Sequence, residues 1–177
     1  AVLYGDLFER VVYRTRPYEA IEGSVNELHA KWLEKARKNV ESGSIFEFNR
    51  NMKKIVAEFD QIELLDIQKP RVGVVGEILV KYSKTANDDI VSIIEEEGGE
   101  AVVLDLIGFM NYSLYNQIWK ADEIGFSKKN KLMAKTFIGI INMLEKPMNK
   151  ALKASKRFDS IESIYDIAAS TEEVISI

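Results

Sequence analysis

Polar side chains that could contact a ligand are concentrated between residues 76 and 87. These candidate site residues are Gly76, Glu77, Lys81, Tyr82, Thr85 and Asn87. A helix that begins near Asn87 would point its free amides toward the same space, which favours an anion. However, the glycines match neither the G-x-G-x-x-G pattern nor a P-loop, and Glu77 would repel a phosphate. The alternative interpretation is a polar loop that caps a helix.

A second candidate site lies in residues 13–19, which hold two arginines and two tyrosines. A guanidinium group binds phosphate or carboxylate through two parallel hydrogen bonds, and a tyrosine stacks or donates a hydrogen bond. We therefore expect Arg14 and Arg16 to contact a phosphate-bearing ligand such as CoA or a nucleotide. The alternative is a strap between domains that pairs with acidic side chains elsewhere in the chain.

Several other kinds of site are excluded by the residue types. The chain has no cysteine, so it forms no disulfide and offers no thiolate to zinc or an iron–sulfur cluster. The single histidine, His29, has no Asp or second His beside it in the sequence. Ser113 and Ser127 have no histidine nearby in the sequence for a hydrolase triad. We predict no metal site.

The composition is typical of a soluble globular domain. Of the 177 residues, 46% are hydrophobic and 29% are charged. A net charge of −4 argues against binding to nucleic acid. The apolar runs are shorter than the roughly 20 residues that span a bilayer, and no signal segment opens the chain, so we expect a cytoplasmic protein without membrane contact. Because the sequence begins without Met and ends in apolar residues, we expect truncation at both ends.

The first third of the chain is predicted to be helical. Leu3, Leu7 and Val11 share one helix face, and that helix must end before Pro17. Capping boxes are predicted at Ser24 and at Ser44, each with a glutamate three residues later. Gly43 would end the first of these two helices, which gives an antiparallel helix pair.

A βαβ unit is predicted over about residues 71–105. The β-branched run at residues 72–76 is typical of a strand that is buried on both faces of a parallel sheet. A helix capped by Thr85 or Asn87 would follow, and a second strand at residues 101–104 would complete the unit. Two strands are too few for a doubly wound fold. The missing strands are expected outside this chain rather than hidden at residues 137–141.

The remaining residues return to helical patterns. We expect helices over residues 106–119 and from Ser127 onward, with Pro147 kinking or restarting the second. Asp159 or Ser160 is expected to cap a last helix. The predicted fold is therefore helix-rich α/β, with a small parallel sheet flanked by helices, as a Rossmann- or flavodoxin-like fragment. Residues 1–68 would form a helical segment and 69–177 the βαβ unit with its helices, unless the whole is one continuous domain.

Several segments resemble one known family, the acyl-CoA dehydratase activase-related proteins, which belong with the 2-hydroxyacyl-CoA dehydratases and their activators. The resemblance is carried by Lys69–Lys81, Thr85–Asn87, Asp89–Val91, Ile94–Val103, Arg14–Glu19, Lys146–Met148 and Ser155–Phe158. It covers most of the chain. Members of this family are very large chains that combine activase-like modules with dehydratase-like modules.

The resemblance implies α/β domains around a cysteine-ligated [4Fe-4S] cluster, which receives an electron from an ATP-hydrolysing activase and removes water from a 2-hydroxyacyl-CoA. This chain lacks the cysteines and any P-loop-like signature. We therefore expect it to bind neither cofactor itself, and the cluster and ATP would belong to other modules. Its expected role is that of a scaffold or acyl-CoA pocket wall, inactive alone, with other modules of the parent chain or dehydratase and activase subunits as partners. The alternative is a structural interaction domain without a ligand.

Overall fold

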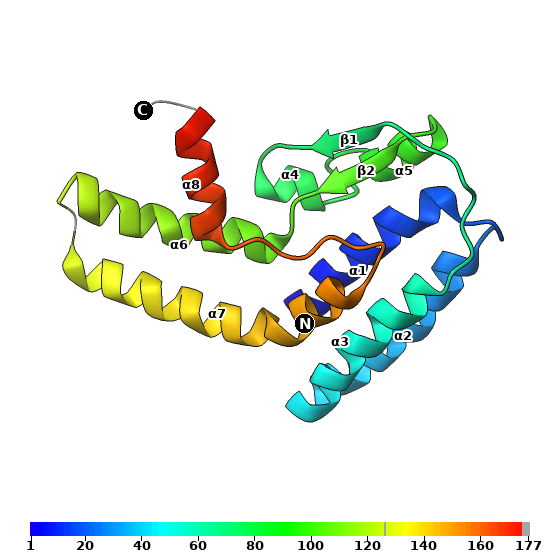
Figure 1. The fold of residues 1–177 in the computed structure, drawn as a ribbon, viewed down its shortest axis with the longest axis horizontal. Helices are drawn as coiled ribbons and strands as arrows, with labels where there is room; N and C mark the ends of the chain where they lie inside the picture. Colours follow the sequence, from blue (N-terminus) through cyan, green and yellow to red (C-terminus); the bar gives the residue numbers. More distant parts are fainter. Residues whose placement is uncertain (126, 175–177) are drawn as a thin grey trace.

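Helix α1 (Val2–Thr15) lies at the centre of the fold, between a pair of helices and a small sheet (Figure 1). The computed structural model describes residues 1–125 and 127–174. Leu7 and Val11 of α1 are fully buried in the main core. The helix ends before Pro17, as predicted, and continues as the 3₁₀ turn η1 (Arg16–Tyr18).

Helices α2 (Ser24–Ser42) and α3 (Ile45–Asp60) form the predicted helix pair. Gly43, with φ of 68°, ends α2 in the left-handed conformation that glycine favours. Ser44 caps α3 as predicted, because its side chain accepts a hydrogen bond from the Glu47 amide at 3.2 Å. The prediction of a capping box at Ser24 is wrong.

The start of α2 is capped from the preceding turn. The Glu19 carboxylate accepts hydrogen bonds from the amides of Gly23 at 2.9 Å and Val25 at 2.8 Å. The Ser24 hydroxyl donates to the same carboxylate at 3.1 Å, so it is not the acceptor that a capping box requires. A negative charge is also favourable at this end of a helix.

The predicted βαβ unit is present and makes the protein a helix-rich α/β fold. Strands β1 (Arg71–Val74) and β2 (Glu100–Val103) pair in parallel, with Arg71 opposite Glu100 and Val74 opposite Val103. Helix α5 (Ile90–Glu96) connects them and packs on β2 through Val91 and Ile94. Within the described residues the sheet contains only these two strands.

Strand β1 is more exposed than its sequence predicts. It ends at Val74 rather than at Gly76, and its Val72 is 39% exposed. Just beyond it, Val75 is 83% exposed. The prediction of burial on both faces is wrong because the helices that cover the sheet, α1 and α5, pack mainly on β2. Within the described part of the chain β2 is also the only strand beside β1, so the other edge of β1 is open.

Helices α6 (Leu106–Glu123) and α7 (Lys128–Ala154) form a second hairpin, with α8 (Ile164–Val174) beside α6 (Figure 1). Residues 137–141 lie within α7, so no strand is hidden there. Helix α7 also continues through Pro147 without a restart. Within the described residues, no helix combines the length and apolarity that crossing a bilayer requires.

The last helix begins later than predicted. Instead of starting after Asp159 or Ser160, α8 starts at Ile164. The Asn149 side chain bonds both backbone groups of Ile161, accepting from its amide at 3.1 Å and donating to its carbonyl at 3.0 Å. These two bonds compete with the helical ones.

One hydrophobic core joins helices α1, α2 and α3 to α7 and the segment that follows it. Met148 and Leu152 of α7 and the following Phe158 pack in the same core as Leu7 of α1 and Phe59 of α3. Residues on both sides of position 69 therefore contribute to this core. The open sheet and the α6–α7 hairpin have smaller clusters of their own.

Gly99→Ala is expected to destabilise the βαβ unit by about 2 kcal/mol. A Cβ at this position would lie 2.8 Å from Ile94 Cγ2 and 3.1 Å from the Ile94 carbonyl oxygen, so the turn before β2 would have to move. Urea unfolding followed by circular dichroism measures the loss. Gly73→Ala is the control, because its Cβ would meet no atom within 4 Å. Equal effects of the two substitutions would contradict this account of Gly99.

Candidate functional site

The predicted loop at residues 76–87 contains a short helix, α4 (Ile78–Tyr82), which its sequence did not predict. The Glu77 carboxylate caps this helix, accepting from the amides of Leu79 at 2.7 Å and Val80 at 3.3 Å. These amides are therefore already bonded to a carboxylate. Gly76 and Thr85, in the same 76–87 loop, are exposed.

Asn87 connects α4 to α5. Its side-chain nitrogen donates to the carbonyls of Val80 at 2.9 Å and Lys81 at 3.1 Å. Its side-chain oxygen accepts from the Ile90 amide at 3.4 Å. The helix begins only at Ile90 and has seven residues, so the predicted start at Asn87 or Thr85 is wrong. Both groups of the Asn87 amide contribute to the fold.

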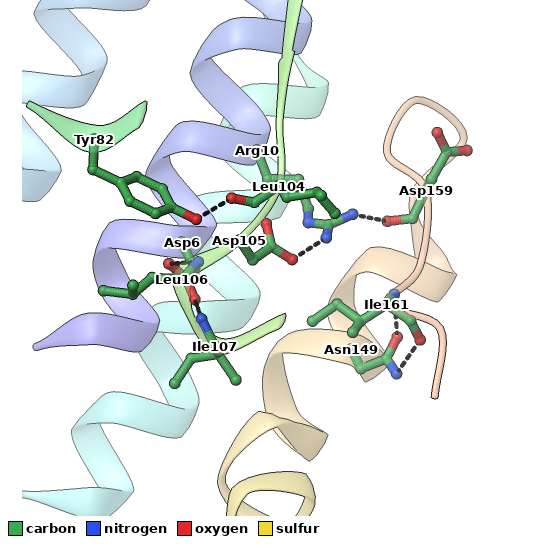
Figure 2. A network of polar contacts seen from close by, with 10 residues as sticks. All are labelled: Asp6, Arg10, Tyr82, Leu104, Asp105, Leu106, Ile107, Asn149, Asp159 and Ile161. Carbon is green, nitrogen blue, oxygen red and sulfur yellow. Dashed lines mark hydrogen bonds and ion pairs between the residues drawn. The ribbon is translucent and has the colours of Figure 1, made fainter. Parts of the chain in front are cut away.

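The last two residues of α4 point into the protein. Lys81 is buried, with its ammonium 4.6 Å from the centre of the Tyr82 ring. The Tyr82 hydroxyl donates to the carbonyl of Leu104, just after β2 (Figure 2). Burial lowers the pKa of Lys81 and raises the pKa of Tyr82. These side chains attach α4 to the rest of the fold.

Acidic side chains gather where β2 ends. Asp6 of α1 is buried and accepts hydrogen bonds from the amides of Leu106 at 3.1 Å and Ile107 at 2.9 Å (Figure 2). Asp6 therefore caps α6 from another helix. Asp105 pairs with Arg10, and Arg10 also donates to the Asp159 carbonyl at 3.4 Å.

Two glutamates near this cluster have strongly raised pKa values. Burial, with the like charges of Asp6 and Asp105, raises the pKa of Glu9 to about 7. Burial and the same two charges raise the pKa of Glu145 to about 7. Within residues 1–125 and 127–174, no group of three or more acidic or histidine side chains has a geometry that could hold a metal ion.

Asp6→Ala is expected to lower the free energy of unfolding by about 2 kcal/mol, because two amides at the start of α6 lose their acceptor. Thermal unfolding gives the loss of stability. Hydrogen exchange at Leu106 and Ile107 shows whether it arises at the helix start. Asp66→Ala, at an exposed position, is the control. Unchanged exchange at these amides would show that Asp6 does not act as the cap.

The two predicted arginines lie near the opposite end of the sheet from the 76–87 loop and have different surroundings. Arg16 makes a two-pronged ion pair with Glu95 at 2.7 and 3.0 Å, and its guanidinium lies 5.6 Å from the centre of the Tyr13 ring. Arg14 pairs with Glu100 at the start of β2. The structure therefore does not bring the two candidate sites together.

Glu100 is the centre of a polar cluster that the sequence did not reveal. It is 1% exposed, yet three side chains contact its carboxylate. Arg14 pairs with it, the Arg71 Nε lies 3.1 Å away, and the Tyr18 hydroxyl donates at 2.7 Å. The only local signal is an acidic residue at the first position of a strand, opposite Arg71.

A cavity of about 400 Å³ opens beside this cluster, at the amino-terminal ends of the strands. We call it the arginine cavity; its charged and hydroxyl-bearing lining residues are Arg14, Tyr18, Lys69, Arg71, Glu100 and Arg157. The Arg157 guanidinium is held in place because it donates to the carbonyls of Phe59 at 2.6 Å and Ile62 at 3.0 Å.

Comparison of the chain with protein-family models, curated proteins and solved structures finds no match.

Proposed function

We propose that this chain is a non-catalytic module of a cytoplasmic acyl-CoA dehydratase-type protein, and that its Rossmann- or flavodoxin-like fragment holds neighbouring modules in place. Two features of the sequence support the proposal: the resemblance of residues 69–103 to that family, and the absence of cysteine to ligate a cluster. The observation that carries it is the open edge of β1.

The open edge is suited to a further strand. Parallel sheets normally have both faces covered by helices and contain more than two strands. Arg71, Val72 and Gly73 are exposed, and within the described residues β1 has one strand partner. A strand edge presents free amides and carbonyls that another strand can bond. The proposed partner is a strand of a neighbouring module, added beside β1 and covered by its own helix.

The side chains of the 76–87 loop support a scaffold better than a ligand site. Glu77, Tyr82 and Asn87 all bond to backbone groups of the fold. An acyl-CoA pocket wall is the second candidate function. It is favoured by a cavity of about 220 Å³ along β2, lined in part by Leu104 and Asp105.

A CoA titration distinguishes these two candidates. If the chain is a scaffold, the amide signals of Gly76, Glu77 and Asn87 in the loop and of Leu104 and Asp105 at the cavity stay fixed while CoA is added to the isotope-labelled chain. If the chain is a pocket wall, the signals of Leu104 and Asp105, which line the cavity, shift together and saturate. Saturable shifts at these two residues would replace the scaffold assignment by the second candidate.

Hydrogen exchange tests the open edge directly. We expect the β1 amides that do not bond to β2 to exchange more than about tenfold slower in a longer product of the same gene than in this chain alone. Val75→Lys should reverse part of that protection, because charge on an edge opposes strand addition. Phe46→Lys is the matched control, since Phe46 is 79% exposed and lies on α3. Equal exchange in both proteins would refute the scaffold proposal.

A further inference from the structure

We infer that the arginine cavity binds the phosphate groups of a small molecule, with a diphosphate as the best-matched chemistry. This inference goes beyond the proposed function and does not depend on it. The site lies at the amino-terminal ends of β1 and β2, away from the 76–87 loop, and it includes Arg14 of the second candidate site.

The charge around the cavity is strongly positive. Four cationic side chains line it, and Glu100 is the one carboxylate among the lining residues, so three positive charges remain. This concentration stands out in a chain whose net charge is −4. Like charges held close together destabilise a fold unless a counter-charge is present. A bound polyanion would supply it.

The buried carboxylate leaves hydrogen-bond donors unused. Glu100 contacts Nη1 of Arg14 and Nε of Arg71, which is one nitrogen of each guanidinium group. The Arg14 Nε is buried and has no hydrogen-bond partner within the described part of the chain. A guanidinium group carries five N–H donors. Glu100 therefore orients both arginines without satisfying them.

Arg157 adds a third guanidinium group, which backbone carbonyls hold in place. Its two bonds to carbonyls near the end of α3 hold it at the cavity wall. Burial lowers the pKa of Arg157; the nearby Asp60 carboxylate opposes this shift, and the positive charge of Arg14 adds to it. The repulsion between these two guanidinium groups would be relieved by an anion placed between them.

The size and shape of the cavity favour a small molecule. A volume of about 400 Å³ falls in the range of small-molecule sites. Guanidinium forks match phosphate oxygens, and a diphosphate carries enough charge to balance the excess. Leu64, Leu65 and Ile67 line another side of the cavity and offer an apolar surface to the remainder of the ligand.

Calorimetric titration of the full chain with inorganic pyrophosphate tests the inference. We expect saturable binding that weakens as the NaCl concentration rises. Arg71→Gln should lower the affinity about tenfold, because it removes one charge-assisted contact. Arg71→Lys should recover part of it. Arg37→Gln, an equal charge change on an exposed side chain of α2, should leave the affinity unchanged.

A second variant and a second anion keep the test decisive. Lys69→Gln, at the edge of the same cavity, should also weaken binding, so the result does not depend on Arg71 variants folding. Thermal unfolding of each variant verifies its fold. The inference is overturned if pyrophosphate gives no saturable heat, if Lys69→Gln and Arg37→Gln behave alike, or if citrate binds the same cavity as tightly as pyrophosphate.

Discussion

Glu100→Ala is expected to lower the free energy of unfolding by about 4 kcal/mol, because it leaves Arg14, Arg71 and Tyr18 without their shared acceptor. Glu100 is fully buried and contacts all three. A hydrogen bond to a charged group contributes about 1.5–3 kcal/mol, and the substitution removes three of them, while the part-exposed side chains of Arg14 and Arg71 recover some of this loss from water. In a protein of this size the midpoint of thermal unfolding should fall by about 12 °C.

Urea unfolding of the wild type and two variants measures this effect. Glu96→Ala is the matched control, because Glu96 lies on the same α5-to-β2 segment and is exposed. It should change the free energy of unfolding by less than about 0.5 kcal/mol. Similar losses in Glu100→Ala and Glu96→Ala would show that the cluster around Glu100 is not an organising element of the fold.

Raising the pH from about 5 to about 8 is expected to destabilise the protein by about 4 kcal/mol through Glu9 and Glu145. Their pKa values are raised from 4.5 to about 7 in the folded protein. Between these values the folded protein holds protons that the unfolded chain has released. Stability is therefore highest below about pH 4.5 for these groups and is lost as the pH rises through 7, with about 2 kcal/mol per group after solvent screening.

Asp6 and His29 also change the pH dependence of stability, in opposite directions. Burial raises the pKa of Asp6, which adds to the effect of the glutamates. Burial lowers the pKa of His29 below 6.5, which opposes it, because the unfolded chain then binds the extra proton. Urea unfolding across the pH range gives the net result. The variant with Glu9→Gln and Glu145→Gln should lose most of the dependence, and Glu97→Gln, at an exposed position, should keep it. A dependence unchanged in the double variant would contradict the assignment.

Local signals in the sequence predicted much of the fold. Proline restricts the residue before it, so α1 had to end before Pro17. Gly43 and Ser44 mark the turn between α2 and α3 because one favours a positive φ and the other accepts an amide three residues later. The second strand, predicted at residues 101–104, lies one residue earlier, at Glu100–Val103. Each of these signals acts within a few residues.

Contacts between distant segments were the part that the sequence could not predict. Asp6 caps α6 across 101 residues, and Arg14 meets Glu100 across 86. An aspartate at position 6 and a glutamate at position 100 are residue types common at exposed positions. Nothing in the local sequence therefore distinguishes these two buried acids from exposed ones. Arg14 was correctly singled out as a side chain able to bind an anion, but its neighbours Arg71 and Arg157 come from strands and loops that only the tertiary fold brings near it.

The spacing of polar residues along α1 has a mechanical consequence. Asp6, Arg10 and Arg14 recur every four residues, and they contact the start of α6, Asp105 and Glu100 in turn. Sliding the helix by one turn, about 5.4 Å, would break all of these contacts together. Helix α1 and strand β2 are therefore expected to move as one rigid body. A force applied to the sheet would then be transmitted to the helical core and would not be absorbed at the contact between α1 and β2.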